Sequence, residues 1–254
     1  MKHFDLTGRV AVITGGNGGI GLGMARGLAL AGASIAIAGR NAAKSRAAVD
    51  ELGALGAKAI AVEADVLVEA SCRELVDRAA AHFGRLDILI NNAGIALRKP
   101  PQAYTAEEWH RVLDSNLTSA FFCAQAAYPH MKRAGGGKVI SIGSIFSVMG
   151  APHAVAYAAS KGGLVQMTRV LATAWAADNI QVNVILPGWI HTELTDRAQR
   201  EVPGLNERVL ARTSAGRWGE PSDFEAIAVL LAGTGSQFIT GAAIPVDGGY
   251  SIQA

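Results

Sequence analysis

A tyrosine and a lysine four residues apart are the side chains of this sequence best suited to acid/base chemistry. On a helix, Tyr157 and Lys161 would share one face, because residues four apart lie one turn apart. An ammonium group beside a phenol favours the phenolate, so we expect Lys161 to lower the pKa of Tyr157 from its usual value of about 10. Such a tyrosine can exchange a proton near neutral pH. The same spacing also occurs as a plain surface pair, so the rest of the chain must support the interpretation.

Two further polar residues precede this pair. Ser144 lies thirteen residues before Tyr157, and Asn116 lies further upstream. A serine hydroxyl can hydrogen-bond a substrate oxygen, and an amide can hold a water or a backbone segment. Taken singly, Ser144 could cap a strand end and Asn116 could brace a helix bend.

A glycine-rich turn follows the first predicted strand. The segment 14–21 reads Thr-Gly-Gly-Asn-Gly-Gly-Ile-Gly and leads into a predicted helix. Glycines at such a turn let the backbone approach a pyrophosphate, and the helix N-terminus offers free N–H groups. We therefore expect the turn to bind a dinucleotide through Gly15, Asn17, Gly18, Gly19, Ile20 and Gly21.

The end of the second predicted strand indicates which dinucleotide binds. An acidic residue that holds the ribose of NAD would stand about 20 residues after the glycines. No carboxylate occurs between Asp5 and Asp50, and Arg40 follows Gly39 at the expected place. An arginine pairs with a 2′-phosphate that a carboxylate would repel, so NADP(H) is favoured over NAD(H). The alternative is that Arg40 is a solvated residue at the start of a helix.

Short apolar runs alternate with helical patterns along the whole chain, which is typical of a parallel sheet covered on both faces. We predict one α/β domain over residues 1–254, a Rossmann-type doubly wound parallel sheet of about seven strands with helices on both faces. The predicted strands are Val10–Thr14, Ser34–Ala38, Ala59–Glu63, Leu86–Ile90, Lys138–Ser144, Gln181–Leu186 and Ala243–Val246. The predicted helices include 20–31 before Gly32, a segment from Asn41 to about Gly56, one opened by a Thr105–Glu108 capping box, and 155–177.

Composition and charge exclude several classes of protein. The chain has 254 residues and a net charge of +2 without a dense basic run, which argues against nucleic acid as a partner. The two cysteines, Cys72 and Cys123, form no metal-binding or disulfide pattern, so we expect a reducing compartment and no metal. Residues 1–9 are charged and unlike a signal peptide, and the uncharged stretch before Lys161 is a poor membrane span. We expect a soluble, cytoplasmic protein that does not bind membranes.

These motifs, in this order and at these spacings, resemble those of the short-chain dehydrogenase/reductase family in its compact single-domain branch. The matching segments are Thr14-Gly15-x-x-x-Gly19-x-Gly21, Asn91-Asn92-Ala93-Gly94, Asn116, Ser144, Tyr157-x-x-x-Lys161, Pro187-Gly188 and the closing Val246-Asp-Gly-Gly249. The resemblance covers nearly the whole chain. It implies an enzyme that interconverts a secondary alcohol and a ketone by hydride transfer to or from a nicotinamide.

The resemblance also implies a role for each matched residue. Tyr157 would be the acid/base, Ser144 would bind the substrate oxygen, Lys161 would lower the tyrosine pKa and bind the nicotinamide ribose, and Asn116 would hold a water. The remaining cofactor contacts would be Asp65 and Val66 at the adenine, Asn92, Ala93 and Gly94 along the cleft, and Pro187, Gly188, Ile190 and Thr192 at the nicotinamide.

The substrate is less clearly indicated. Phe146, His153, Trp189 and His191 are candidates to line its pocket, although each could equally be a core or surface residue. Residues 190–217 are predicted to form a lid of short helices, whose interspersed acids and arginines favour a solvated face. Gluconate and glucose dehydrogenases are the most similar branch, with 3-oxoacyl carrier-protein reductases as the alternative and a non-catalytic dinucleotide sensor as a different class. Relatives of this kind form homotetramers, and the apolar segment 238–245 is compatible with an interface.

Overall fold

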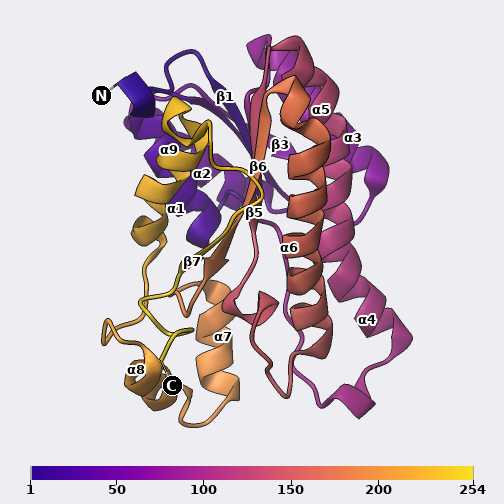
Figure 1. Ribbon diagram of the computed structural model, residues 1–254, viewed down its shortest axis with the longest axis vertical. Coiled ribbons are helices and arrows are strands. Elements are labelled where there is room, and N and C mark those ends of the chain that lie inside the picture. The colour runs from indigo at the N-terminus through magenta and orange to yellow at the C-terminus, as the bar shows by residue number, and fades with distance from the viewer. Residues whose placement is uncertain (1, 254) are drawn as a thin grey trace.

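The computed structural model describes residues 2–253, in which seven parallel strands form one sheet between two layers of helices (Figure 1). The strands lie in the order β3-β2-β1-β4-β5-β6-β7. Their bounds are β1 (Val10–Thr14), β2 (Ser34–Gly39), β3 (Ala59–Glu63), β4 (Ile88–Asn91), β5 (Gly137–Ile142), β6 (Ile180–Pro187) and β7 (Ala243–Val246). The predicted α/β class and the parallel, doubly wound sheet are confirmed.

Three helices cover each face of the sheet, because both faces of the strands are apolar (Figure 1). One layer contains α1 (Gly19–Leu30), α2 (Ala42–Ala54) and α9 (Glu225–Ala232); the other contains α3 (Glu69–Phe83), α5 (Ser119–Arg133) and α6 (Val155–Trp175). The short helices α4 (Ala106–Leu113), α7 (Glu193–Glu201) and α8 (Leu205–Arg212) lie beyond the end of the sheet.

The order of the strands reverses between β1 and β4. Ala11 of β1 is in register with Ile35 of β2 on one side and with Ile88 of β4 on the other. In open α/β sheets a ligand binds outside the carboxyl ends of the strands at such a switch point. The glycine turn after β1 and the loop after β4 therefore meet at one crevice.

The helix ends follow the predicted signals. Asn41 caps α2 by accepting a hydrogen bond from Lys44 N at 2.9 Å, and Thr105 and Glu108 form the expected capping box of α4. Gly32 follows α1 with φ +96°, a conformation that favours glycine. These confirmed signals set where α2 and α4 begin and where α1 ends before β2.

Strand β5 is shorter than predicted, and the difference places a functional group. It ends at Ile142 rather than at Ser144. Ser144 instead caps a short 3₁₀ turn, Ile145–Ser147, with its Oγ accepting a hydrogen bond from Phe146 N at 3.1 Å. The serine hydroxyl is thereby turned out of the sheet.

Residues 190–217 contain the two short helices α7 and α8, as predicted for the lid. They are separated by Pro203 and Gly204, and Gly204 has φ +66°. Both helices pack on a small apolar cluster of Ala198, Leu205, Val209 and Trp218. The segment that contains α7 and α8 is thus folded, and its role as a lid stays a prediction. None of the helices within residues 2–253 is long and apolar enough to cross a membrane.

Candidate active site

A continuous cleft runs along the carboxyl ends of the strands. It consists of two cavities of about 280 Å³ and about 360 Å³ that share Gly15, Asn17, Ala93 and Gly94 among their linings. Almost all of the residues predicted to bind the cofactor line it, namely Gly15, Asn17, Gly18, Gly19, Ile20, Arg40, Asp65, Val66, Asn92, Ala93, Gly94, Tyr157, Lys161, Pro187, Gly188, Ile190 and Thr192.

Gly21 is the exception, because it packs behind the cleft. A Cβ at this position would lie 2.4 Å from Asn92 Nδ2 and 2.6 Å from Gly15 O. Asn92 in turn donates hydrogen bonds to Thr14 O at 3.0 Å and to Gly15 O at 2.9 Å. Gly21 therefore shapes the turn by allowing close packing and does not line either of the two cavities.

The glycine turn places the N-terminus of α1 at the cleft. Gly15 and Gly19 adopt φ +62° and +52°. This left-handed conformation is readily available to glycine and is required by the turn. Gly18 caps α1 without a side-chain hydrogen bond, so the first N–H groups of the helix have no capping partner from that residue. Donors at a helix N-terminus suit a phosphate anion.

Two cations near Arg40 in the cleft were missed by sequence reasoning. Lys44 lines both cavities, and its Nζ lies 2.7 Å from Glu193 Oε1 of the lid helix α7. Arg111 lines the larger cavity together with Arg40. Lys44 lies in the first turn of α2, four residues after Arg40, and this closeness in sequence is the signal that could have identified it.

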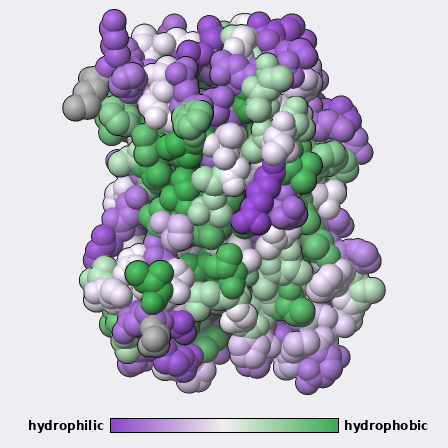
Figure 2. Space-filling view, in the orientation of Figure 1, coloured by the Kyte–Doolittle hydropathy of each residue, from purple (hydrophilic) through white to green (hydrophobic). Residues whose placement is uncertain are grey.

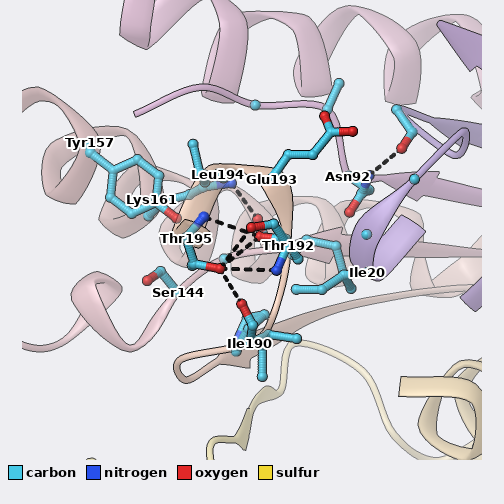
Figure 3. Close-up of a pocket in the computed structure, with 18 of the residues that line it drawn as sticks. Ile20, Asn92, Ser144, Tyr157, Lys161, Ile190, Thr192, Glu193, Leu194 and Thr195 are labelled. Atoms are coloured by element: carbon cyan, nitrogen blue, oxygen red, sulfur yellow. Dashed lines mark hydrogen bonds between the residues drawn. The ribbon is translucent and has the colours of Figure 1, made fainter. Parts of the chain in front are cut away.

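Ser144, Tyr157 and Lys161 meet at the other end of the cleft. Figure 3 shows these three side chains on one side of the cavity, with Ile20 and Asn92 on the opposite side. Lys161 Nζ lies 5.7 Å from the centroid of the Tyr157 ring and donates a hydrogen bond to Ile142 O at 2.6 Å. The predicted one-turn spacing on α6 is confirmed, and β5 provides the group that anchors the lysine.

Asn116 lies behind this cluster in a π-helical turn, Asp114–Thr118, between α4 and α5. Its Nδ2 donates to Ile95 O and to Ser160 Oγ, each at 3.0 Å, and its Oδ1 accepts from Ile95 N at 2.8 Å. The side chain therefore braces the loop after β4 against α6. Both amide hydrogens are used in this brace, so a water that links Lys161 to solvent would need another group of Asn116, and that role stays a prediction.

Burial dominates the ionisation of Tyr157 and Lys161. It raises the pKa of Tyr157 above its usual value, and a hydrogen bond with Ser144 and the charge of Arg98 oppose this rise only in part. Burial also lowers the pKa of Lys161 to about 8. The expected lowering of the tyrosine pKa by Lys161 is not seen in this arrangement, because the lysine is itself poorly solvated and directed at Ile142 O.

A smaller cavity of about 60 Å³ adjoins the cleft at Tyr157 and Ser144. Phe146 and Trp189, two of the predicted substrate residues, line it, and the ring of Phe146 meets the rings of Tyr157 and Trp189 edge-on at 6.4 Å and 6.0 Å. Arg98 also lines this cavity and was missed by sequence reasoning.

The two predicted histidines lie outside this cavity. His153 is exposed, and its main-chain carbonyl accepts a hydrogen bond from Lys99 N. His191 stacks on the ring of Trp218, which is buried in the lid cluster, at 5.1 Å. Neither histidine lines the smaller cavity, although His191 is linked to Trp189 through Trp218, whose ring meets that of Trp189 at 5.6 Å.

The sequence matches known proteins over nearly its full length. Residues 15–251 match the family described as Enoyl-(Acyl carrier protein) reductase. The chain is 40% identical over 251 residues to a 2-dehydro-3-deoxy-D-gluconate 5-dehydrogenase of Escherichia coli, covering 98% of each chain. It is 38% identical over 256 residues to the Rhamnolipids biosynthesis 3-oxoacyl-(acyl-carrier-protein) reductase of Pseudomonas aeruginosa, covering 98% of this chain and 99% of the relative.

The fold is equally close to that of solved structures. A gluconate 5-dehydrogenase from Burkholderia cenocepacia, crystallised in complex with NADP and tartrate, aligns with a TM-score of 0.94 and 39% identity over 100% of this chain and 99% of that one. The glycine turn, the serine–tyrosine–lysine cluster and these matches agree with one another. The chain belongs to the short-chain dehydrogenase/reductase family.

Proposed function

We propose that this chain is an NADP(H)-dependent oxidoreductase that interconverts a secondary alcohol and a ketone of a sugar acid, with Tyr157 as the acid/base. The observation that carries the proposal is the position of Tyr157 and Ser144 where two cavities meet. Both side chains line the long cleft and also the smaller cavity beside it. Hydride transfer needs such a junction, because the proton donor must reach the substrate oxygen while the reacting carbon faces the cofactor.

The chain's residues would handle the proton and the substrate oxygen. The Tyr157 hydroxyl donates its proton to a carbonyl oxygen in reduction, and the phenolate accepts a proton from an alcohol in oxidation. Ser144 Oγ accepts a hydrogen bond from Phe146 N and itself hydrogen-bonds Tyr157, which places the serine hydroxyl beside the group that would exchange a proton with the substrate oxygen. Lys161, held by Ile142 O, would face the ribose of the nicotinamide from beside Tyr157.

The residues of the cleft fit NADP(H). The open N-terminus of α1 suits the pyrophosphate, and Arg40, Lys44 and Arg111 line the cavity beyond the end of β2, where a 2′-phosphate would lie. When bound, the nicotinamide supplies or accepts the hydride. NADP in the Burkholderia neighbour supports this assignment over NAD(H).

The relatives support a sugar acid as the substrate. The relative from Escherichia coli is named for 2-dehydro-3-deoxy-D-gluconate, and the neighbour with tartrate bound is a gluconate 5-dehydrogenase. One relative is a 3-oxoacyl carrier-protein reductase, which makes a 3-oxoacyl thioester the alternative substrate.

A panel of substrates tests this function. Nicotinamide absorbance would be followed with NADP⁺ and sugar acids such as gluconate, and with NADPH and keto-sugar acids or 3-oxoacyl thioesters. We expect turnover of at least one sugar acid, with NADP(H) preferred over NAD(H). Turnover of the thioesters alone would favour the alternative, and tight NADPH binding without turnover of any substrate class would favour a sensor.

We further propose a cytoplasmic homotetramer with a lid over residues 190–217. The face that carries β7 has hydrophobic side chains in its middle (Figures 1 and 2), and Phe238, just before this edge strand, is fully exposed. Exposed apolar groups beside an edge strand suit a contact with another copy of the chain. Light scattering after size exclusion should give four times the chain mass of 26.3 kDa, and a monomer would contradict the tetramer.

A further inference from the structure

A cavity of about 140 Å³ lies at the amino ends of the central strands, at the opposite edge of the sheet from the dinucleotide cleft. Arg9 directly precedes β1, Lys138 is the second residue of β5, Gln181 is the second residue of β6, and all three line the cavity. The loop between α5 and β5 and the segment after α9 complete its wall. None of the residues assigned above to the cofactor or the substrate lines it, so the proposed function leaves this cavity unexplained.

Lys138 brings a buried positive charge to the cavity. The residue is only 9% exposed, and within residues 2–253 its Nζ donates a single hydrogen bond, to Ser236 Oγ at 3.0 Å. Ser236 Oγ itself donates to Leu231 O at 2.9 Å, so the partner of the ammonium is a neutral hydroxyl. Lys138 makes no ion pair with any carboxylate of the described residues. Two of its three N–H donors are therefore left for a ligand.

The two carboxylates that line the cavity do not neutralise Lys138. Asp87 is buried and accepts hydrogen bonds from Arg9 Nη1 at 2.7 Å and from Arg85 Nη2 at 2.6 Å. Asp5 is exposed to solvent. Since two arginines share the one buried carboxylate, this corner of the molecule has a surplus of positive charge before Lys138 is counted. Buried charges in proteins are normally paired, so an ammonium without a counter-charge needs an explanation.

Arg9 is the second cation that the cavity can offer to a ligand. Within the described residues its side chain makes hydrogen bonds only through Nη1, which leaves the other guanidinium donors unused. Burial and, to a smaller extent, the charge of Arg9 lower the pKa of Lys138 to about 8. The two cations thus repel each other, and an anion between them would replace this repulsion with attraction.

We propose that this cavity is a second binding site, which takes a small oxyanion of the phosphate or sulfate type between Lys138 and Arg9. The size of the cavity suits such a ligand with a few waters, since one water occupies about 30 Å³ in the liquid. The cavity has half the volume of the smaller of the two cavities that form the dinucleotide cleft, about 140 Å³ against about 280 Å³, so a whole dinucleotide would not fit. Gln181 Nε2, which donates to Asn179 Oδ1 at 3.2 Å, has a second N–H for the same anion.

Thermal unfolding in the presence of inorganic phosphate tests the site. The melting temperatures of the wild type and Lys138→Met would be followed by circular dichroism as phosphate replaces chloride at constant ionic strength. A ligand that binds only the folded chain stabilises it, so at about five times its dissociation constant we expect the wild type to gain about 2–4 °C more than the variant. Phosphate that enters the dinucleotide cleft acts on both proteins alike and cancels in this comparison.

Two further variants separate the charge of Lys138 from other effects. Lys138→Gln keeps a polar group near Ser236 without the charge and should lose the extra stabilisation as Lys138→Met does. Lys132→Met removes a lysine that already pairs with Asp178 at 2.9 Å and should behave as the wild type.

Calorimetric titration provides a direct count of the sites. Lys138→Met should bind one phosphate fewer per chain than the wild type. Sulfate and glycerol phosphate extend the titration: equal binding of all three anions would assign the site to any exposed oxyanion group, and loss of the bulkier monoester alone would assign it to the free ion. Equal stabilisation of the wild type and Lys138→Met, or no stabilisation of either, would overturn the proposal.

Discussion

At the scale of single residues, the site combines a phenol and an amine that are both costly to ionise. Burial raises the pKa of Tyr157 and lowers that of Lys161 to about 8, so each group is biased toward its neutral form. A hydrogen bond with Ser144 and the charge of Arg98 partly offset the effect of burial by lowering the pKa of Tyr157. The acid/base chemistry therefore depends on the neighbours of Tyr157 as much as on the spacing of the pair.

Arg40 provides a residue-scale prediction about the cofactor. Arg40→Ala should weaken NADPH binding by about 10- to 100-fold and NADH binding by less than about 3-fold, because only NADPH carries a 2′-phosphate for the guanidinium. Titration of protein fluorescence with each nucleotide measures both constants. Lys44→Ala removes a second cation from the same cavity and serves as the comparison variant. Equal losses of NADPH and NADH affinity in Arg40→Ala would refute the phosphate contact.

The sequence identifies these residues unevenly. Tyr157, Lys161 and the glycine turn are set by local spacing, so they could be predicted from the chain alone. Arg98 reaches the smaller cavity from the loop after β4, and Lys44 reaches the cleft from the first turn of α2, so both depend on the fold. The pKa of Tyr157 could not be predicted either, because it depends on burial by segments distant in sequence.

At the scale of elements, α1 is held against the segment before α9 by glycines that allow close contact. A Cβ at Gly23 would lie 2.1 Å from Pro221 O, a backbone atom that cannot yield cheaply. Gly53, near the end of α2, is exposed and has open space around it. The two glycines thus differ in function although both lie within helices.

This difference predicts opposite effects of one substitution. Gly23→Ala should lower the free energy of unfolding by about 1–3 kcal/mol through overpacking. Gly53→Ala should raise it by about 0.5–1 kcal/mol, because alanine favours the helix and nothing blocks its methyl group. Urea denaturation of both variants measures the changes. A neutral Gly23→Ala would contradict the close packing of α1.

The elements themselves were well predicted, but their ends were not always so. Strands β1, β3 and β7 have the predicted bounds, since apolar runs and turn residues mark them. β5 ends two residues early, because the Ser144 hydroxyl captures Phe146 N and starts a 3₁₀ turn. A side-chain hydroxyl here competes with the neighbouring strand for a backbone hydrogen bond, and the hydropathy of the sequence does not reveal such a competition.

At the scale of the whole molecule, a buried lysine at the start of β5 couples stability to pH. Lys138 is 9% exposed and donates to Ser236 Oγ at 3.0 Å, and burial lowers its pKa from 10.5 to about 8. Below pH 8 the lysine is charged in both the folded and the unfolded chain, and the cost of burying that charge is fully present. Between pH 8 and 10.5 the unfolded chain binds more protons, so stability rises with pH.

Lys138→Met should remove this dependence. The unfolding free energy of the wild type relative to the variant should increase by about 2–3 kcal/mol between about pH 7.5 and about pH 10. Lys161 makes the same contribution in both proteins and cancels in the difference. Urea denaturation at the two pH values measures this difference in unfolding free energy. A difference that does not change with pH would show that folding does not lower the pKa of Lys138.

The measurement that tests the central claim most directly compares the wild type with Tyr157→Phe. Phenylalanine keeps the ring that packs edge-on against Phe146 and removes only the hydroxyl that exchanges the proton. Sugar-acid turnover with NADP(H) should fall by at least about 1,000-fold, while the NADPH dissociation constant changes less than about 3-fold. A variant that turns over its substrate at the wild-type rate would contradict the role of Tyr157 as the acid/base and with it the mechanism proposed for this site.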